Sequence, residues 1–538
     1  MQDAIEPSFA APRMLSDARQ VSAGTTLSAD VCIIGAGAAG ITLATELAQG
    51  SQKVVLLESG GFDFEEATQS LYQGEIVGHP LNALDVSRLR YFGGTTNHWG
   101  GMCAPLAAGD FRVRPWVQYS GWPIGADDLT GYWRRAVPYV QISSDNFSAH
   151  DWAAELPAIF QGNMLGDRLA PLMFQQSPPT RFGEVFRQRL TEAKSVEAFL
   201  HANVLSLDTD SEAHTVEKVR VGCLDGNRFT VRARVFILAT GAIENARLLL
   251  LSDGVQATGL GNGNDLVGRF FMGHPQFDDG ARIVLDEPTA AAAKPLGSTL
   301  RSYAMLQLTA ATSAREQLPG FAAHLDPRAS EAAPTLHHTP SYLALKRLVA
   351  RIKGTEFPTT TAVDDLQTVF GDLDGLVSGL YTRFGKAPIL DVRPQCEQVP
   401  NPASRVYLGE ERDALGLRRI VVDWRLTDLD LLGMRRGLAI VGDVFAGNGL
   451  GRLELSEALQ EATPATLACA EAWHHIGTTR MSDDRRAGVV DRDCRVHGTN
   501  NLYVAGSSVF PTTGIVNPTF TIVALAIRLA DHLRSRTA

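Results

Sequence analysis

The amino-acid sequence predicts an α/β fold of two units. One is assembled from separated pieces of chain around buried parallel strands, and the other has an antiparallel sheet with flanking helices. A buried-type strand at Asp30–Ile34 runs directly into a glycine-rich turn, the helical pattern Ala38–Leu47 follows, and a second buried-type strand comes at Lys53–Leu57. The chain has 538 residues, more than one compact core normally holds.

The turn after the first strand reads Gly35-Ala-Gly37-Ala-Ala-Gly40 and opens the predicted helix. This is the pattern of a Rossmann-type dinucleotide-binding turn. Gly35 permits the tight turn, Gly37 lets the backbone approach a pyrophosphate, and Gly40 lets helix and strand pack closely. Free N–H groups at the start of the helix then face the phosphates.

The second strand ends at Glu58, 18 residues beyond Gly40, close to where dinucleotide-binding folds place an acidic residue. Its carboxylate can accept hydrogen bonds from the hydroxyls of an adenosine ribose. It would repel a 2′-phosphate, which argues against NADP. FAD and NAD share the fingerprint, so these residues alone leave the choice between them open.

Later elements divide the chain. The strand-like run Arg234–Leu238 leads into a leucine-rich helix, and a helical pattern covers 518–533. We therefore expect an N-terminal arm at 1–28 and a discontinuous nucleotide-binding domain at 29–110, 200–280 and 465–538. Short strands alternate with charged turns between about 281 and 464, and we expect this segment, together with 111–199, to form a substrate domain.

Four further segments carry chemistry. In chain order they read Tyr91-Phe-Gly93-Gly94-Thr95-Thr-Asn97-His98-Trp99-Gly100-Gly101, Ala239-Thr240-Gly241-Ala-Ile-Glu244-Asn245, His474-His475-Ile-Gly477, and Gly506 followed by Asn517-Pro518-Thr519. Together they resemble the glucose–methanol–choline (GMC) oxidoreductase family of flavoproteins, from about residue 29 to 535. The resemblance implies FAD bound in an extended form and oxidation of a primary or secondary alcohol.

The resemblance also implies a catalytic pair, His474 and Asn517. Imidazole suits a general base near neutral pH, and the amide would hold the substrate oxygen against it. Asn517 in place of a second histidine matches a His/Asn subgroup that contains sugar and sterol oxidoreductases. Two alternatives stay open here: His475 is the facing histidine, or Asn517 is only an N-cap with Pro518 at the first helical position.

His98 stands where several members of the family attach FAD covalently, and other members bind FAD without that bond. The alternatives are therefore a covalent link and a histidine that hydrogen-bonds in the flavin pocket. Thr95 is expected near the flavin N5. The expected cofactor-binding residues are Gly35, Gly37, Ala38, Ala39, Gly40, Glu58, Gly93, Gly94, Thr95, Asn97, His98, Trp99, Gly241, Gly506, Pro518 and Thr519.

Two other polar residues are weaker candidates. His274 lies either near the active-site wall or, as the favoured interpretation, at a domain junction where its ring nitrogens are satisfied. Gln398 lies in a segment resembling the substrate-domain strand of sugar-oxidising relatives, and it is a candidate contact for substrate hydroxyls.

Composition excludes several classes of protein. The formal net charge of −10 makes a nucleic-acid partner unexpected. The six cysteines form no Cys-x-x-Cys pair, so no metal site or dithiol centre is expected. The start of the chain lacks a signal-peptide pattern, and no apolar run reaches the roughly 20 residues that span a bilayer. We expect a soluble, cytoplasmic chain, with export beside a signal-bearing partner left open.

The predicted function is FAD-dependent oxidation of an alcohol group, most simply on a sugar, glycoside or cyclitol. The substrate part rests on Asn517 and on the Gln398 segment, both by analogy. The alternatives are a non-sugar alcohol such as a sterol or terpenoid, a flavoprotein lyase or decarboxylase on the same scaffold, and a non-catalytic binding module. Oxygen, a quinone or a cytochrome could each act as electron acceptor.

Overall fold

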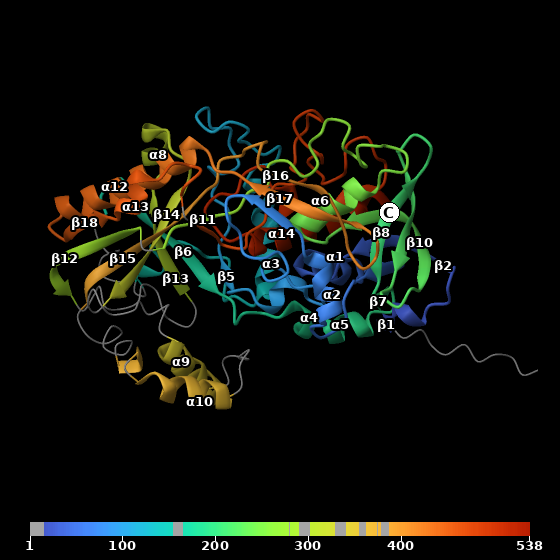
Figure 1. Cartoon of the computed structure of the whole chain (residues 1–538), viewed down its shortest axis with the longest axis horizontal. Helices are drawn as coiled ribbons and strands as arrows, with labels where there is room; N and C mark the ends of the chain where they lie inside the picture. Colours follow the sequence, from blue (N-terminus) through green and yellow to red (C-terminus); the bar gives the residue numbers. More distant parts are fainter. Residues whose placement is uncertain are drawn as a thin grey trace, which may run out of the picture.

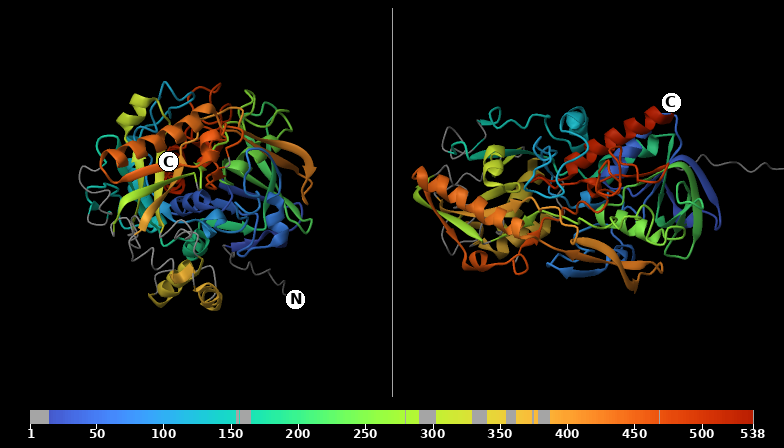
Figure 2. Two further views of the ribbon diagram at one scale, coloured as in Figure 1. Left: turned by 60° about the vertical axis from the view of Figure 1, so that its left-hand side comes forward. Right: turned by 90° about the horizontal axis from the view of Figure 1, so that it is seen from above.

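The computed structural model describes residues 15–153, 156, 165–278, 280–289, 302–328, 340–353, 362–373, 375–377, 387–467 and 469–537. The molecule is elongated, with one large sheet toward each end (Figure 1). Seen from above, helix α12 (Asp428–Gly447) lies at one end and the C-terminal helix α14 (Thr519–Thr537) toward the other (Figure 2). The predicted α/β fold is confirmed.

The first sheet has eight strands in the described part of the chain, ordered β1–β7–β3–β2–β10–β9–β8 with β20 beside β10. The pairs from β1 to β10 and the β10–β20 pair are parallel, and β9 and β8 add an antiparallel edge. The strands are β1 (Leu15–Asp17), β2 (Thr26–Ile34), β3 (Val54–Leu57), β7 (Val196–Leu200), β8 (Asn203–Thr209), β9 (Val216–Gly222), β10 (Arg228–Leu238) and β20 (Leu502–Val504).

The central strands are buried because they carry continuous hydrophobic runs, as parallel strands covered on both faces do. Residues 31–34 of β2 and all of β3 are buried. Helix α1 (Ala38–Leu47) begins directly after the glycine turn, and the Gly37 carbonyl accepts the first helical hydrogen bond, from the Ile41 N–H at 2.9 Å. The turn therefore lies at the carboxyl edge of the sheet, where ligands bind in such folds.

The second sheet is antiparallel throughout its described strands, ordered β18–β12–β15–β14–β13–β6–β5, with β11 and β19 paired at the edge of β15. Helix α12 packs against it and starts with a capping box between Thr427 and Asp430. The strands are β5 (Met102–Cys103), β6 (Leu169–Gln176), β11 (Pro275–Gln276), β12 (Ala281–Thr289), β13 (Ser302–Leu308), β14 (Phe321–Arg328), β15 (Ala387–Cys396), β18 (Gly451–Leu455) and β19 (Ala470–Glu471).

A small third sheet joins β4 (Glu75–Gly78) to β17 (Arg418–Trp424) and β16 (Arg405–Arg412). The buried hydrophobic residues form two clusters, one around the first sheet and one between the second sheet and α12. The remaining α-helices with described bounds are α2 (Glu66–Gln69), α3 (Asp127–Val140), α4 (Phe182–Val185), α5 (Arg187–Glu192), α6 (Ala242–Leu251), α8 (Ala310–Glu316), α9 (Pro340–Lys353), α10 (Ala362–Gly371) and α13 (Glu457–Glu461).

The sheets cross the predicted domain boundaries at several places, and β5, β11 and β19, which lie in the predicted nucleotide-binding segments, belong to the second sheet. β1 lies in the predicted N-terminal arm and β7 in the predicted substrate segment 111–199, yet the two pair in the first sheet. β17 lies in the predicted substrate segment 281–464 and pairs with β4. The strands that pair here lie far apart in the sequence, so a local sequence pattern does not predict their pairing. Residues 1–14 of the arm lie outside the described residues.

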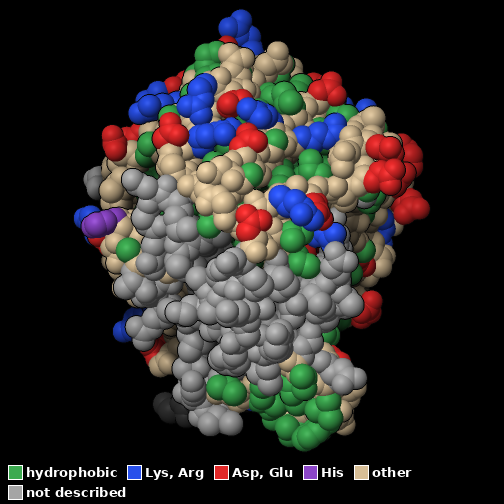
Figure 3. Space-filling model, turned by 90° about the vertical axis from the view of Figure 1, so that its left-hand side faces the viewer, with side chains coloured by type: hydrophobic (Ala, Val, Ile, Leu, Met, Phe, Trp, Pro, Cys, Tyr) green, Lys and Arg blue, Asp and Glu red, His purple; other side chains and the backbone are tan. Residues whose placement is uncertain are grey.

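None of the helices described here is long and apolar enough to cross a membrane. Helix α10 does expose hydrophobic side chains at helical spacing: Val363, Leu366 and Phe370 are 62%, 45% and 69% exposed. Hydrophobic side chains gather at the lower tip of the molecule in Figure 3, the end at which Figure 1 places α9 and α10.

Candidate functional site

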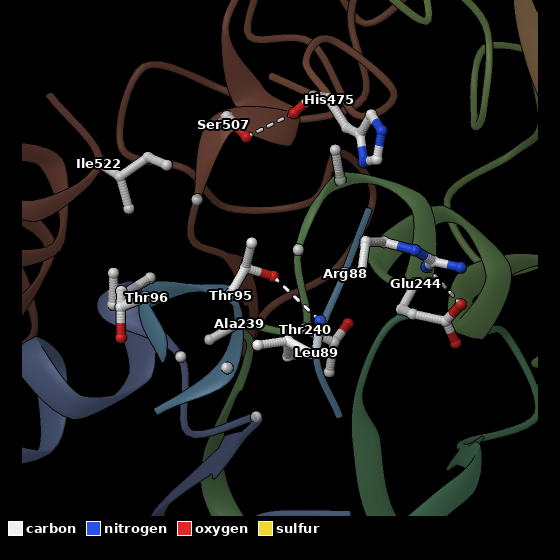
Figure 4. Close-up of a pocket in the computed structure, with 18 of the residues that line it drawn as sticks. Arg88, Leu89, Thr95, Thr96, Ala239, Thr240, Glu244, His475, Ser507 and Ile522 are labelled. Atoms are coloured by element: carbon white, nitrogen blue, oxygen red, sulfur yellow. Dashed lines mark hydrogen bonds and ion pairs between the residues drawn. The ribbon is translucent and has the colours of Figure 1, made fainter. Parts of the chain in front are cut away.

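A cavity of about 310 Å³ lies where the glycine turn, the second glycine-rich loop and the C-terminal motifs meet. That volume is within the range of small-molecule and cofactor sites. Figure 4 shows side chains from several parts of the chain around it. The lining residues come from 34–39, 57–59, 87–90, 94–100, 239–244, 472–475, 505–507 and 517–522, with a few others.

The three glycines of the first turn have different surroundings. A Cβ at Gly35, whose φ is +100°, would lie 2.6 Å from the Ala239 carbonyl oxygen, and a Cβ at Gly40 would lie 1.9 Å from the Gly35 carbonyl oxygen. These two glycines are required by the packing of turn, helix and strand. A Cβ at Gly37 would meet no heavy atom within 4 Å. The turn is therefore open at Gly37, on the side of the cavity.

Glu58 is buried beneath this turn and lines the cavity. Its Oε2 accepts a hydrogen bond from the Ala36 N–H at 2.8 Å, and its Oε1 accepts one from the Gly60 N–H at 2.9 Å. An ionised carboxylate has about four acceptor positions. Glu58 thus fastens the glycine turn and keeps acceptor capacity for a hydroxyl in the cavity.

The second glycine-rich loop packs directly on the first. The Gly93 N–H donates to the Ala36 carbonyl at 2.9 Å, and a Cβ at Gly94 would lie 3.2 Å from the Gly37 Cα. Gly94, Thr95, His98 and Trp99 line the cavity, as do the predicted residues Gly35, Gly37, Ala38, Ala39, Gly241, Gly506, Pro518 and Thr519. Figure 4 shows the Thr95 hydroxyl oxygen turned to the Leu89 N–H, at 3.4 Å.

Three predicted cofactor residues do not line this cavity: Gly40, Gly93 and Asn97. Gly40 serves helix packing, as described above. Gly93 has a φ of +98° and turns the loop. The Asn97 side chain points back into its own loop, where Nδ2 donates to the Phe92 carbonyl at 3.0 Å.

His98 faces the cavity with a free ring nitrogen. Its Nε2 is buried and has no hydrogen-bond partner in the described part of the chain, and its ring centroid lies 5.2 Å from that of Trp473. Burial lowers the pKa of His98, and the Arg181 guanidinium lowers it further. His98 is therefore a neutral imidazole whose Nε2 is available to a ligand.

His474 and Asn517 meet in the wall of the same cavity. The Asn517 Nδ2 lies 3.2 Å from the His474 Nε2. An N-cap side chain would accept a hydrogen bond from the first turn of its helix, but among the described residues the Asn517 Oδ1 has no partner. The Asn517 side chain therefore makes no N-cap hydrogen bond in the described part of the chain.

Burial holds the pKa of His474 well below its ordinary value, and the neighbouring His274 and His475 lower it further. His475 lines the cavity too, but its Nε2 faces a carboxylate: it lies 3.6 Å from the Glu471 Oε2. Burial lowers the pKa of His475 to about 3 and raises that of Glu471 to about 7. His474 is thus the histidine that meets Asn517.

The His274 ring nitrogens are both satisfied, as the favoured interpretation from the sequence expected, and the ring lies directly behind His474 without lining the cavity. The His274 Nδ1 lies 2.9 Å from the His474 Nδ1, and its Nε2 lies 2.9 Å from the Gly514 carbonyl oxygen. The contact joins residues 200 positions apart. The residues around His274 in the sequence do not reveal this partner.

Gln398 is not placed to touch a substrate. It is fully buried, and its Oε1 accepts from the Gly273 N–H and the Trp424 Nε1–H, both at 2.9 Å. Its Nε2 donates to the Arg425 carbonyl at 3.0 Å. Gln398 therefore supports the segment that carries His274.

Arg88 and Arg90 line the cavity and were not predicted. Arg88 donates to Glu244 at 2.9 Å, and both guanidinium groups lie over the Tyr72 ring (Figure 4 shows Arg88 and Glu244). Burial alone would raise the pKa of Glu244, but Arg247, Arg88 and Arg90 together lower it to about 2. The sequence signal for these two cavity residues is their position: both arginines come directly before the Gly93-Gly94 loop.

Two family models match this chain, each over a different range of residues. Residues 400–526 match the family model described as GMC oxidoreductase, a range that holds His474 and Asn517. Residues 30–257 match the model described as FAD dependent oxidoreductase, a range that holds the glycine turn and Glu58.

Two curated proteins are similar over nearly their full lengths. The chain is 22% identical to the fructose dehydrogenase large subunit of Gluconobacter japonicus, over 94% of this chain and 98% of that protein. It is 25% identical to 6'''-hydroxyparomomycin C oxidase of Streptomyces lividus, over 95% of this chain and 92% of that protein. Among solved structures, pyridoxine 4-oxidase from Mesorbium loti has the same fold, with a TM-score of 0.58 and 17% identity over 94% of this chain and 99% of that one.

Proposed function

This chain is a GMC-type, FAD-dependent oxidoreductase, and on that premise we propose that it oxidises a hydroxyl group of a sugar, glycoside or cyclitol with His474 as the base. The contact between the His474 Nε2 and the Asn517 Nδ2, 3.2 Å long, is the observation that carries the proposal. Both residues line the same cavity as the glycine turn.

The residues of the cavity fit FAD. The space beside Gly37 admits a pyrophosphate at the start of α1, where free backbone N–H groups and the helix dipole favour negative charge. Glu58 has acceptor capacity for ribose hydroxyls, and the partnerless His98 Nε2 faces the same cavity. When bound, FAD supplies the acceptor for the hydride that leaves the alcohol carbon.

His474 would take the hydroxyl proton at Nε2. Because burial keeps its pKa well below the ordinary value, the ring is neutral near pH 7 and can accept a proton. The Asn517 amide would donate to the substrate oxygen while that oxygen loses its proton. Such a donor holds the oxygen beside the base and stabilises the negative charge that develops there.

The names of the two relatives favour a polyhydroxylated substrate over a sterol or terpenoid, since one is a fructose dehydrogenase and the other an oxidase of a hydroxyparomomycin. The amides of Gln276 and Gln395 carry no argument on the substrate. Neither residue lines the cavity, Gln276 donates to the Gln395 Oε1 at 2.7 Å, and the Gln395 Nε2 donates to the Ile515 carbonyl at 2.8 Å.

The test is anaerobic titration of the yellow protein with a panel of sugars, glycosides, cyclitols, simple alcohols and a sterol, followed by loss of flavin absorbance. We expect bleaching by one of the polyols. The His474→Ala variant should keep FAD and bleach about 10²–10⁴-fold more slowly, the usual contribution of a general base.

The control variant is His497→Gln. The His497 Nε2 also bonds a backbone carbonyl, that of Ser482 at 2.8 Å, but His497 does not line the cavity. Bleaching by the sterol alone would contradict the substrate class, and an unchanged rate in His474→Ala would contradict the assignment of the base. Reoxidation with oxygen, a quinone and a cytochrome in turn then identifies the electron acceptor.

A further inference from the structure

His474 and Asn517 are linked by hydrogen-bond contacts to two further residues, His274 and Gly514. The His274 Nε2 meets the Gly514 carbonyl oxygen at 2.9 Å, the His274 Nδ1 meets the His474 Nδ1 at 2.9 Å, and the His474 Nε2 meets the Asn517 Nδ2 at 3.2 Å. The chain itself connects the two ends of this series of contacts, because Gly514 and Asn517 belong to the same loop. Each contact therefore restricts the proton positions in the next.

The direction of every bond follows from the carbonyl. A carbonyl oxygen only accepts, so the His274 Nε2 carries the proton. Burial lowers the pKa of His274 to about 4, so near neutral pH this ring is neutral and its Nδ1 is an acceptor. The His474 Nδ1 must then carry a proton to donate, which leaves the His474 Nε2 as a lone pair that accepts from the Asn517 amide.

The opposite arrangement leaves a conflict. If the Asn517 Oδ1 faced the His474 Nε2, that nitrogen would carry the proton and the His474 Nδ1 would be a lone pair. It would then oppose the lone pair of the His274 Nδ1 at 2.9 Å. Protonating His274 would resolve the conflict only in acidic solution, given its lowered pKa. One arrangement alone satisfies all the ring nitrogens near neutral pH.

We propose that His274 is a positioning residue that fixes the proton of His474 on Nδ1, so that the Nε2 lone pair faces the substrate hydroxyl. The inference rests on the proposed role of His474 as the base. Which ring nitrogen of a histidine carries the proton is generally set by the bond that the other nitrogen makes. When the substrate O–H bond breaks, a His474 Nε2–H bond forms, and the Nδ1 proton remains donated to His274.

The backbone holds the two rings in this position. Met272 and Ile476 exchange two hydrogen bonds, of 3.0 and 2.9 Å, and Pro275 of β11 pairs with Glu471 of β19. His274 and His474 therefore sit between two backbone pairings. Glu471 also accepts from the His474 N–H at 2.7 Å, and Gln398 accepts from the Gly273 N–H at 2.9 Å.

Other titratable groups act on the pair from the elements around it. Glu397, the residue after β15, favours the protonated form of His274, while burial opposes that form more strongly. His475, the next residue along the chain, disfavours the protonated form of His474. Neither group makes the Nδ1 contact, so the tautomer depends on His274.

Two substitutions at 274 separate proton placement from simple support of the Gly514 loop. An asparagine offers its Oδ1 near the position of a histidine Nδ1, so His274→Asn keeps an acceptor for His474 and loses the donor to Gly514. A glutamine offers its Nε2 near the position of a histidine Nε2, so His274→Gln keeps the donor to Gly514 and loses the acceptor. His497→Gln is the matched control for the substitution itself.

The first readout is the ¹⁵N spectrum of the histidine rings at neutral pH, with His474 identified by the signal lost in His474→Ala. We expect a proton on Nδ1 in the wild type and in His274→Asn, and a shift toward Nε2 in His274→Gln. The second readout is the rate of flavin bleaching. His274→Gln should lose about 10²-fold, as expected for a misplaced general base, and His274→Asn should react at least about tenfold faster than His274→Gln.

Several outcomes would overturn the inference. A proton on Nδ1 in His274→Gln, or a wild-type proton on Nε2, would show that His274 does not set the tautomer. Equal losses in both variants, with equal falls in melting temperature, would show structural support only. If no polyol bleaches the flavin, the proposed function fails, and the ¹⁵N spectra alone still decide the inference.

Discussion

The Asn517 side-chain amide lies 3.2 Å from the His474 Nε2, although the two residues are 43 positions apart in the sequence. Asn517 precedes a helix and has the right residue type for an N-cap, yet among the described residues its Oδ1 accepts no hydrogen bond. The side chain is directed to the histidine. This orientation makes the two roles of Asn517 separable by experiment.

Asn517→Asp should leave the melting temperature near that of the wild type, because no capping bond is lost. A carboxylate offers no N–H to the substrate oxygen, and its charge favours a proton on the His474 Nε2. The rate of flavin bleaching should fall more than tenfold, about 1.4 kcal/mol of barrier. Stopped-flow absorbance and a melting curve measure both quantities.

The control for this change is Asn264→Asp. The Asn264 amide also donates to a carbonyl, that of Arg485 at 2.8 Å, on an exposed surface. A wild-type bleaching rate in Asn517→Asp would remove Asn517 from the active pair. A bleaching rate and a melting temperature both equal to those of the wild type would fit a capping role, because aspartate caps a helix as well as asparagine does.

The pH dependence of bleaching should reflect the buried base. An ordinary histidine is half protonated near pH 6.5. Because burial holds the pKa of His474 well below that value, the ring stays neutral as the pH falls from 8 through 6.5. At saturating substrate the bleaching rate should be flat over that range and fall only in more acidic solution. An acid limb centred at or above pH 6.5 would contradict this assignment.

Substitution of Gly37 and of Gly40 by a residue with a side chain should have different effects. Gly37→Val should fold with nearly the wild-type melting temperature, because a Cβ there meets no heavy atom within 4 Å, but it should lose bound FAD. Gly40→Ala places a Cβ 1.9 Å from the Gly35 carbonyl oxygen and should lose about 1–3 kcal/mol of stability, as overpacking does. Full flavin occupancy in folded Gly37→Val would refute the role of the turn.

His98→Ala should hold FAD less tightly than the wild type, whether the wild-type histidine forms a covalent link or a hydrogen bond. A single lost hydrogen bond of about 0.5–1.5 kcal/mol corresponds to a several-fold weaker affinity. Flavin retained after dialysis measures the change. Acid precipitation of the wild type separates the two cases, since a covalent flavin stays in the pellet. Unchanged retention in the variant would leave His98 only its packing against Trp473.

Glu471 should make stability depend on pH. Burial raises its pKa to about 7 in the folded protein, above its ordinary value of 4.5. Between these values the folded chain binds a proton that the unfolded chain has lost, so stability declines as pH rises from about 4.5 to 7. Glu471→Gln should flatten that part of the curve of unfolding free energy against pH. An equally steep decline in the variant would show that another group is responsible.

Much of the fold was predictable because its signals are local. The glycine turn, the helix Ala38–Leu47 and the strand ending before Glu58 depend on residues a few positions apart, and α1 has the predicted bounds. The last helix, predicted at 518–533, occurs as Thr519–Thr537. Hydrophobic periodicity and glycine-rich turns involve residues close together in the chain, so the sequence alone predicts them.

The sequence by itself determined the elements around the cavity and the residue types that carry the chemistry. Only the tertiary structure decided which of them meet: His274 beside His474, Arg88 in the cavity wall, Gln398 inside the protein, and β1 paired with β7. The reason is that these contacts join residues far apart in the chain. Their selection depends on how whole sheets and loops pack, and a local pattern does not encode that packing.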